Sequence, residues 1–141
     1  MVRKIGAFVV GILTLGAVVM TLQQVAAQLH PLPEGLDPMD RSNAEAFAAH
    51  LETMPPAAWA IAFLSEILGA FSGALVAGWI ARDARGVVSG VIVGLALVGS
   101  IANWNSFAHP TWFIAGQIVL YPTVLFLALL LLEKRAPGAA A

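Results

Sequence analysis

The sequence predicts an all-α polytopic membrane protein: four transmembrane helices and a short amphipathic helix in the first outer loop. The first observation is composition, since 60% of the 141 residues are hydrophobic, 11% are charged and the mean hydropathy is +0.86. Soluble domains contain about 45–50% apolar and about 25% charged residues. A soluble fold of this length would still expose roughly a third of its chain surface to water. The excess of apolar side chains therefore points to a lipid environment.

The second observation is that four segments are long and apolar enough to span a bilayer, which takes roughly 20 residues. They lie at about 5–27, 57–81, 86–104 and 111–132 and are joined by the outer loop 28–56 and two short turns. Because the turns are short, successive helices must pack side by side. We therefore expect residues 1–141 to form a single four-helix transmembrane domain.

The first span, 5–27, has an alternative interpretation. It follows Arg3 and Lys4 and ends in the small residues Ala26 and Ala27, as a cleaved signal peptide would. Its apolar run is longer than the usual hydrophobic region of a signal peptide. We therefore expect a retained helix, with cleavage in the cell as the alternative.

The third observation is the distribution of basic residues, which predicts the orientation. Six of the seven fall on one side of the predicted membrane: Arg3, Lys4, Arg82, Arg85, Lys134 and Arg135. Only Arg41 lies in the other loops. Since short cytoplasmic loops carry the excess of Lys and Arg, we expect an inner-membrane protein with both termini cytoplasmic. The loop 28–56 would then be periplasmic or extracellular.

The loop 28–56 contains the predicted amphipathic helix. Its first half, LHPLPEGLDP, has too many prolines for regular structure. Its second half has a helix start signal, either Asp37 before Pro38 or Ser42 three residues before Glu45. Apolar residues then recur at helical spacing, so this helix is expected to lie on the outer membrane surface.

Small residues recur every four positions on the second and third spans. Gly69 and Gly73 lie on the second span, and Gly86, Gly90 and Gly94 lie on the third. Membrane helices associate through close backbone packing, which small residues permit. We expect these residues to hold the two spans together as an antiparallel hairpin, with a homodimer seam as the alternative.

Glu66 is an acid in the middle of the second span. At about 100° per residue it shares a face with the small residues of that helix, so its carboxyl group should point into the bundle. An ionised group there costs several kcal/mol. The uncharged partners nearest in predicted depth are Gln117, Tyr121 and Ser100, with Ser65, Ser72, Gln23 and Gln24 as further possibilities. We expect a protonated acid in a polar cluster, able to bind a proton or ligand or to clamp the helices.

Other chemistry finds little support. The chain has no cysteine, no nucleophile or phosphate-loop motif, and a net charge of −1, which argues against nucleic acid as a partner. His30, His50 and His109 all fall outside the spans and match no ligand spacing. We therefore expect no enzymatic activity, no cofactor and no metal.

The segments EGLDPMD, EILGAFSGALVAGWIARD and AHPTWF resemble small uncharacterised bacterial four-helix inner-membrane proteins. The resemblance covers most of the chain. It implies the fold and the inner membrane, but no activity.

Two functions remain open. We expect a structural or accessory subunit that docks a larger membrane-protein partner or membrane lipid. The alternative is a small proton-coupled transporter or ligand-binding carrier that uses Glu66 and acts as a homo-oligomer. The first predicts that Glu66→Gln is tolerated after assembly, and the second predicts that it abolishes a pH-dependent flux or binding.

Overall fold

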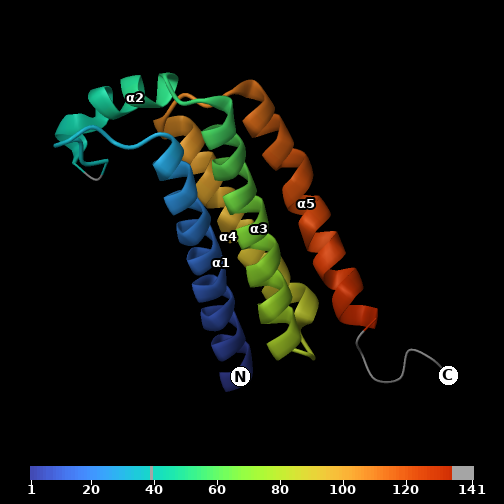
Figure 1. Ribbon diagram of the computed structural model, residues 1–141. Helices are drawn as coiled ribbons and strands as arrows, with labels where there is room; N and C mark the ends of the chain where they lie inside the picture. The colour runs from blue at the N-terminus through green and yellow to red at the C-terminus, as the bar shows by residue number, and fades with distance from the viewer. Residues whose placement is uncertain (39, 135–141) are drawn as a thin grey trace.

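A computed structural model describes residues 1–38 and 40–134, and every regular element in this part of the chain is a helix (Figure 1). The elements are α1 (Val2–Leu29), η1 (Arg41–Asn43), α2 (Ala44–Glu52), α3 (Pro56–Ile80), α4 (Arg85–Ser106) and α5 (Thr111–Lys134). The four long helices are each long and apolar enough to cross a membrane. The prediction of an all-helical fold with four such helices is confirmed for these residues. Arg135 lies outside the described residues.

Helix α3 occupies the centre of the bundle. It packs against α1, α4 and α5, while α1 touches α4 only lightly. The N-terminus and the end of α5 lie at the same end of the bundle as the turn between α3 and α4, and α2 lies at the opposite end (Figure 1). We call these the terminal end and the loop end.

The short helix in the first loop matches the expected amphipathic helix only loosely. The Asp40 side chain accepts a hydrogen bond from the Ser42 backbone N–H (2.9 Å) and so starts η1, a role that the sequence did not suggest for Asp40. This bond lowers the pKa of the Asp40 carboxyl group. None of the α2 residues is fully buried, although the Phe47 ring packs edge-on against Phe107 (centroids 5.0 Å apart).

The backbones of α1 and α3 approach each other very closely at three glycines. A Cβ atom on Gly73 would lie 2.7 Å from the carbonyl oxygen of Gly11, and one on Gly69 would lie 2.6 Å from a methyl group of Val19. Real Cβ contacts are longer than this, so only glycine fits. Gly69 and Gly73 therefore hold α3 against α1, whereas the sequence suggested α4 as their partner.

The prediction that Gly86, Gly90 and Gly94 pack against the second span is wrong, while the alternative of a homodimer seam stays a prediction. A Cβ atom on Gly86, Gly90 or Gly94 would meet no described atom within 4 Å. The reason is the rotation of α4, which buries Val88, Ser89, Ile92 and Val93 and so turns these glycines away from the bundle.

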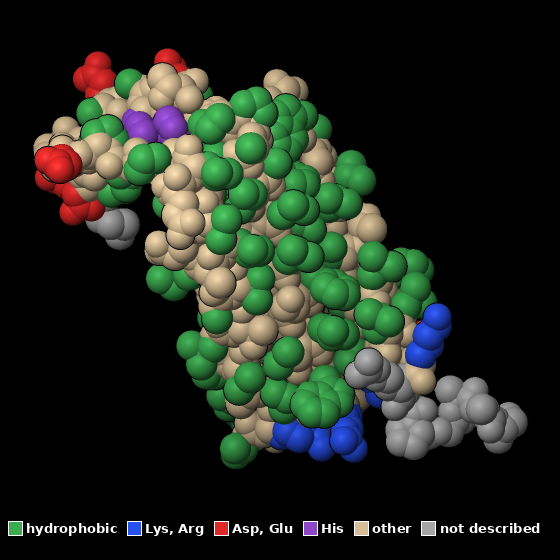
Figure 2. Space-filling model, in the orientation of Figure 1, with side chains coloured by type: hydrophobic (Ala, Val, Ile, Leu, Met, Phe, Trp, Pro, Cys, Tyr) green, Lys and Arg blue, Asp and Glu red, His purple; other side chains and the backbone are tan. Residues whose placement is uncertain are grey.

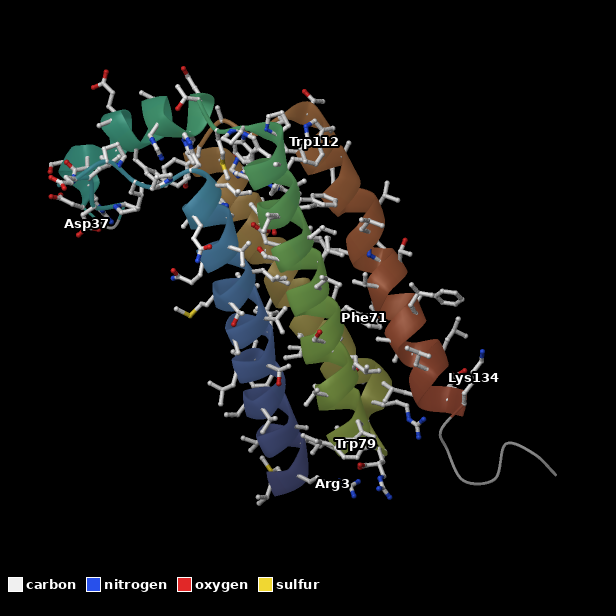
Figure 3. All side chains as sticks on the ribbon, in the orientation of Figure 1. Arg3, Asp37, Phe71, Trp79, Trp112 and Lys134 are labelled. Carbon is white, nitrogen blue, oxygen red and sulfur yellow. The ribbon has the colours of Figure 1, made fainter. Side chains whose placement is uncertain are left out.

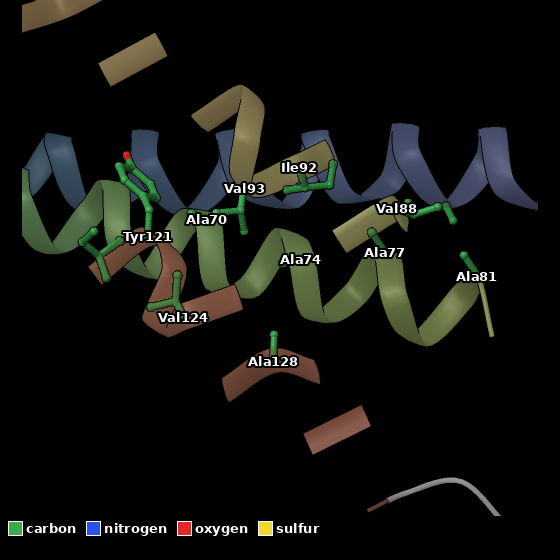
Figure 4. Packing of buried hydrophobic residues seen from close by; sticks show 12 residues of the cluster. Ala70, Ala74, Ala77, Ala81, Val88, Ile92, Val93, Tyr121, Val124 and Ala128 are labelled. Atoms are coloured by element: carbon green, nitrogen blue, oxygen red, sulfur yellow. The ribbon is translucent and has the colours of Figure 1, made fainter. Parts of the chain in front are cut away.

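The contact between α3 and α4 is instead built from alanine on one side and branched residues on the other. Ala70, Ala74 and Ala77 of α3, with Ala81 directly after it, form a buried row in one cluster with Val88, Ile92 and Val93 of α4 and Val124 and Ala128 of α5 (Figure 4). The Ser89 hydroxyl group donates a hydrogen bond to the Ala74 carbonyl (2.7 Å). The two helices are therefore closely packed in the half of the bundle nearest the terminal end.

Charges and aromatic side chains separate between the two ends. Lys and Arg gather at the terminal end, and Asp and Glu are most prominent around α2 (Figure 2). Asp83 forms ion pairs with Arg3 and Lys4, and the hydrogen bond from Arg3 lowers the pKa of the Asp83 carboxyl group. Trp79 and Trp112 are exposed at opposite ends of the bundle (Figure 3), as expected for membrane-interface aromatics.

Two histidines tie the first loop to the end of α1. The His30 and His50 rings are stacked with centroids 3.9 Å apart, and the His30 ring nitrogen Nε2 lies 3.0 Å from the His50 carbonyl oxygen. Burial, together with repulsion from His30, lowers the pKa of His50. The neutral ring is therefore the form that suits the docked loop.

Gly73→Ala and Gly90→Ala test the close contact between α1 and α3. Each replacement favours the helix by ~1 kcal/mol in propensity, but only the methyl group at Gly73 collides with backbone. We expect Gly73→Ala to destabilise the bundle by about 1–3 kcal/mol and Gly90→Ala to be neutral or stabilising. Reversible unfolding in mixed micelles measures both. Equal effects would contradict the close α1–α3 contact.

Acidification is expected to loosen the docked loop. The pKa of His50 is lowered when the loop is docked, so the undocked chain takes up the proton first as the pH falls below about 6.5. Docking is therefore strongest above that pH. Hydrogen exchange of residues 44–52, corrected for intrinsic rates, should show protection that decreases between about pH 8 and about pH 5. His50→Phe keeps a stacked ring without the titration and should remove most of this dependence.

Candidate functional site

Three side chains from two helices converge on one oxygen of Glu66. The Ser100 hydroxyl group donates to Glu66 Oε2 at 2.6 Å, the Gln117 amide donates at 2.7 Å, and the Tyr121 hydroxyl lies at 3.4 Å. Ser100 and Tyr121 are also 2.6 Å apart. The site is thus a network that joins α3, α4 and α5.

The helical repeat explains why these residues meet. Gln117 and Tyr121 are four residues apart on α5, so they lie one above the other on a single face. Ser100 and Trp104 have the same spacing on α4. Both faces turn toward α3, where Glu66 lies about 15 Å from the start of the helix at Pro56. Gln117, Tyr121 and Ser100 are at most 4% exposed.

Trp104 determines how the Gln117 amide is oriented. The indole N–H donates to Gln117 Oε1 at 2.8 Å, which leaves the amide nitrogen to face Glu66. The reverse orientation would bring the NH₂ group against an indole, which can only donate. The donor on the Glu66 side is therefore fixed by packing.

The second carboxylate oxygen of Glu66 is free. Glu66 Oε1 has no hydrogen-bond partner in the described chain, and no buried side-chain atom there lacks one. Oε1 is therefore not sealed inside the protein. One oxygen of the acid is held by the network, and the other is open to a ligand or a proton.

Glu66 also lines a crevice of about 540 Å³ between α1 and α4. Its volume lies in the range of small-molecule sites, about 300–1,000 Å³. Glu66 and Tyr121 contribute from α3 and α5, and the remaining lining residues are Ile12, Leu15, Val19, Gln23, Leu95, Ala96, Gly99, Ser100, Ala102, Asn103 and Ser106. Among these lining residues Glu66 is the only acid, and none is Lys, Arg or His.

The crevice changes character along its length. Towards the loop end it is lined by the amides of Gln23 and Asn103, and towards the terminal end by the apolar side chains Ile12, Leu15 and Leu95. Glu66 lies between these two parts because α3 runs antiparallel to α1 and Gly69 already contacts Val19. Glu66 therefore has polar groups on one side and apolar groups on the other, which makes the crevice an amphipathic site.

The sequence and the structure agree on most of the network. The sequence singled out Gln117, Tyr121 and Ser100 beside Glu66, and each of the three contacts Glu66. Gln23 lines the crevice, but the Ser65 hydroxyl group bonds to the Ala62 carbonyl of its own helix. Whether these residues form a functional site stays a prediction.

Sequence reasoning missed Trp104 and Asn103. Trp104 is part of the network, because its indole N–H donates to Gln117. Its spacing of four residues from Ser100 was the available signal. Asn103 lines the crevice, and its amide nitrogen lies 3.5 Å from His109 Nε2. No signal in the sequence distinguished it from Asn105, whose side chain bonds back to the Ile101 carbonyl.

Within residues 1–38 and 40–134, no group of three His, Asp or Glu side chains could hold a metal ion. Comparisons with known protein families, curated proteins and solved structures gave no match. The resemblance to bacterial four-helix inner-membrane proteins therefore stays a prediction.

The network can be tested by removing its members one at a time. Gln117 is fully buried and serves two partners, so Gln117→Leu leaves the Trp104 N–H unpaired and should cost about 1–3 kcal/mol. Tyr121→Phe leaves Ser100 as a donor to Glu66 and should cost only ~0.6 kcal/mol, the average for such bonds in membrane helices. Reversible unfolding in mixed micelles compares the two. A larger loss for Tyr121→Phe would contradict this ranking.

Proposed function

We propose that this protein is a small proton-coupled transporter or ligand-binding carrier in which Glu66 is the binding group. The observation that carries the proposal is the asymmetry of the carboxylate. Donors from α4 and α5 hold Oε2, while Oε1 has no partner in the described chain and Glu66 lines a crevice large enough for a small molecule. An acid held by one oxygen keeps its position whether the other oxygen is empty, protonated or bound.

The energetic cost of an acid at this depth supports a functional role. A carboxylate inside a membrane costs several kcal/mol, and such residues usually mark ion or substrate pathways. A purely structural clamp gains little, because interhelical hydrogen bonds in membranes average ~0.6 kcal/mol. A clamp would also have no need of an oxygen that opens into a crevice.

We propose that the chain lies in a bacterial inner membrane with both termini in the cytoplasm. Arg3, Lys4 and Arg85 lie at the terminal end, and Glu45 and Glu52 lie in α2 at the loop end. The positive-inside rule then makes the terminal end cytoplasmic and the loop 28–56 periplasmic or extracellular. In this orientation Glu66 lies in the outer half of the bilayer and the polar part of the crevice faces outward.

A second candidate is the accessory subunit favoured by the sequence alone. The observation that favours it is the outer face of α4, where Gly86, Gly90 and Gly94 have open space in front of them. A helix of a larger membrane protein, or of a second copy, could approach closely there. In this function Glu66 would serve assembly rather than binding.

The test is isolation from native membranes in polymer discs, followed by mass spectrometry of retained molecules. If the protein is a carrier, the wild type retains a small molecule that Glu66→Gln loses. Glu133→Gln is the matched control, because Glu133 is an exposed acid near the end of α5 and does not line the crevice. It should behave as the wild type does.

Two further readouts separate the candidates. Infrared difference spectra between acidic and neutral pH should contain a carboxyl band that Glu66→Gln removes, if Glu66 exchanges a proton. A stoichiometric larger membrane protein, retained equally by the wild type and by Glu66→Gln, would argue for the accessory subunit and against the carrier.

A further inference from the structure

We infer that the ligand of the Glu66 crevice is an amphipathic primary ammonium ion: an aliphatic chain with an R–NH₃⁺ head. The inference rests on the proposed function and names the class of molecule that the crevice would select. It follows from the charge of the crevice, from the kind of polar groups at its loop end and from the direction of its apolar part.

The charge of the crevice lining favours a ligand with a single positive charge. Glu66 is the only acid among the lining residues, and Lys, Arg and His do not occur among them. An anion would therefore meet a carboxylate with no compensating cation, and a dication would leave one charge unpaired away from water. One positive charge beside Glu66 Oε1 balances the site.

The polar groups favour a head that carries N–H donors. A primary ammonium has three donors, and the crevice offers acceptors in Glu66 Oε1 and the amide oxygens of Gln23 and Asn103. In the described chain Gln23 makes no side-chain hydrogen bond, and Asn103 uses only its amide nitrogen, toward His109. Both amide oxygens are therefore free to accept.

A quaternary ammonium ion fits less well. Such ions lack N–H donors and are recognised by the faces of several aromatic rings. Tyr121 is the one aromatic residue that lines the crevice, and it is 1% exposed, with its hydroxyl group in the Glu66 network. The site thus lacks an aromatic cage but has hydrogen-bond acceptors.

The apolar part of the crevice gives the ligand its tail. From Val19 the wall of α1 continues through Leu15 to Ile12, about 10 Å along the helix, opposite Leu95 and Ala96. This part leads from Glu66 toward the middle of the four-helix region. A chain attached to a head at Glu66 would lie along it, with Leu95 at the partly exposed edge.

The experiment compares n-octylammonium with n-octyltrimethylammonium, two probes with the same chain and charge. Binding to the full-length protein in lipid nanodiscs is measured by titration calorimetry at neutral pH, with empty nanodiscs subtracted. We expect n-octylammonium to bind about tenfold more tightly, the effect of hydrogen bonds to a charged head. Asn103→Leu removes one of the three acceptors and should reduce this preference. Asn105→Leu, two positions along the same helix and outside the crevice, should retain it.

Glu66→Gln separates failure of this inference from failure of the proposed function. Equal binding of the two probes, or tighter binding of the quaternary ion, with loss of both in Glu66→Gln, would overturn the ligand class and leave Glu66 as a cation site. Binding that is the same in the wild type and in Glu66→Gln, or absent from both, would overturn the inference together with cation binding by Glu66. A preference that is unchanged in Asn103→Leu would also contradict the inference, because the Asn103 amide would then play no part in binding the head.

Discussion

The close contact between the α1 and α3 backbones determines the rest of the architecture. Gly11, Gly69 and Gly73 let the two helices meet with main-chain atoms nearly touching, which is how helices gain packing energy in lipid. Because α1 packs mainly against α3, it touches α4 only lightly. The crevice is the space left between α1 and α4, so the glycines that close one contact leave the other open.

The two halves of the bundle are held together by different chemistry. Near the terminal end, the alanine row of α3 packs directly on α4 and α5, and the Ser89 hydroxyl group bonds to a backbone carbonyl. Near the loop end, α3, α4 and α5 are joined through the side chains of Glu66, Ser100 and Gln117. In the apolar half, close packing holds the helices together. The polar half places a positioned acid beside an open space, an arrangement suited to binding.

Particular residues show how far the sequence could be interpreted. Glu66 was expected to point inward because it shares a helical face with small residues, and Gln117, Tyr121 and Ser100 were expected near it because they lie at similar depth. Periodicity and depth along a helix are local properties, so these expectations needed no knowledge of neighbouring helices. The predicted partners of the glycine stripes were wrong. A stripe of small residues shows that a helix can be approached closely, but not which helix approaches it.

The sequence by itself determined the number and approximate bounds of the long helices, their apolar character and the inward direction of Glu66, all of which follow from composition and the helical repeat. The tertiary structure decided that α3 is central, that Gly86, Gly90 and Gly94 face outward and that Trp104 orients Gln117. It also decided that one oxygen of Glu66 is left open. The physical reason is that these features depend on the rotation of each helix about its own axis. That rotation is set by packing against several neighbours at once, which the local pattern of residues within one helix does not reveal.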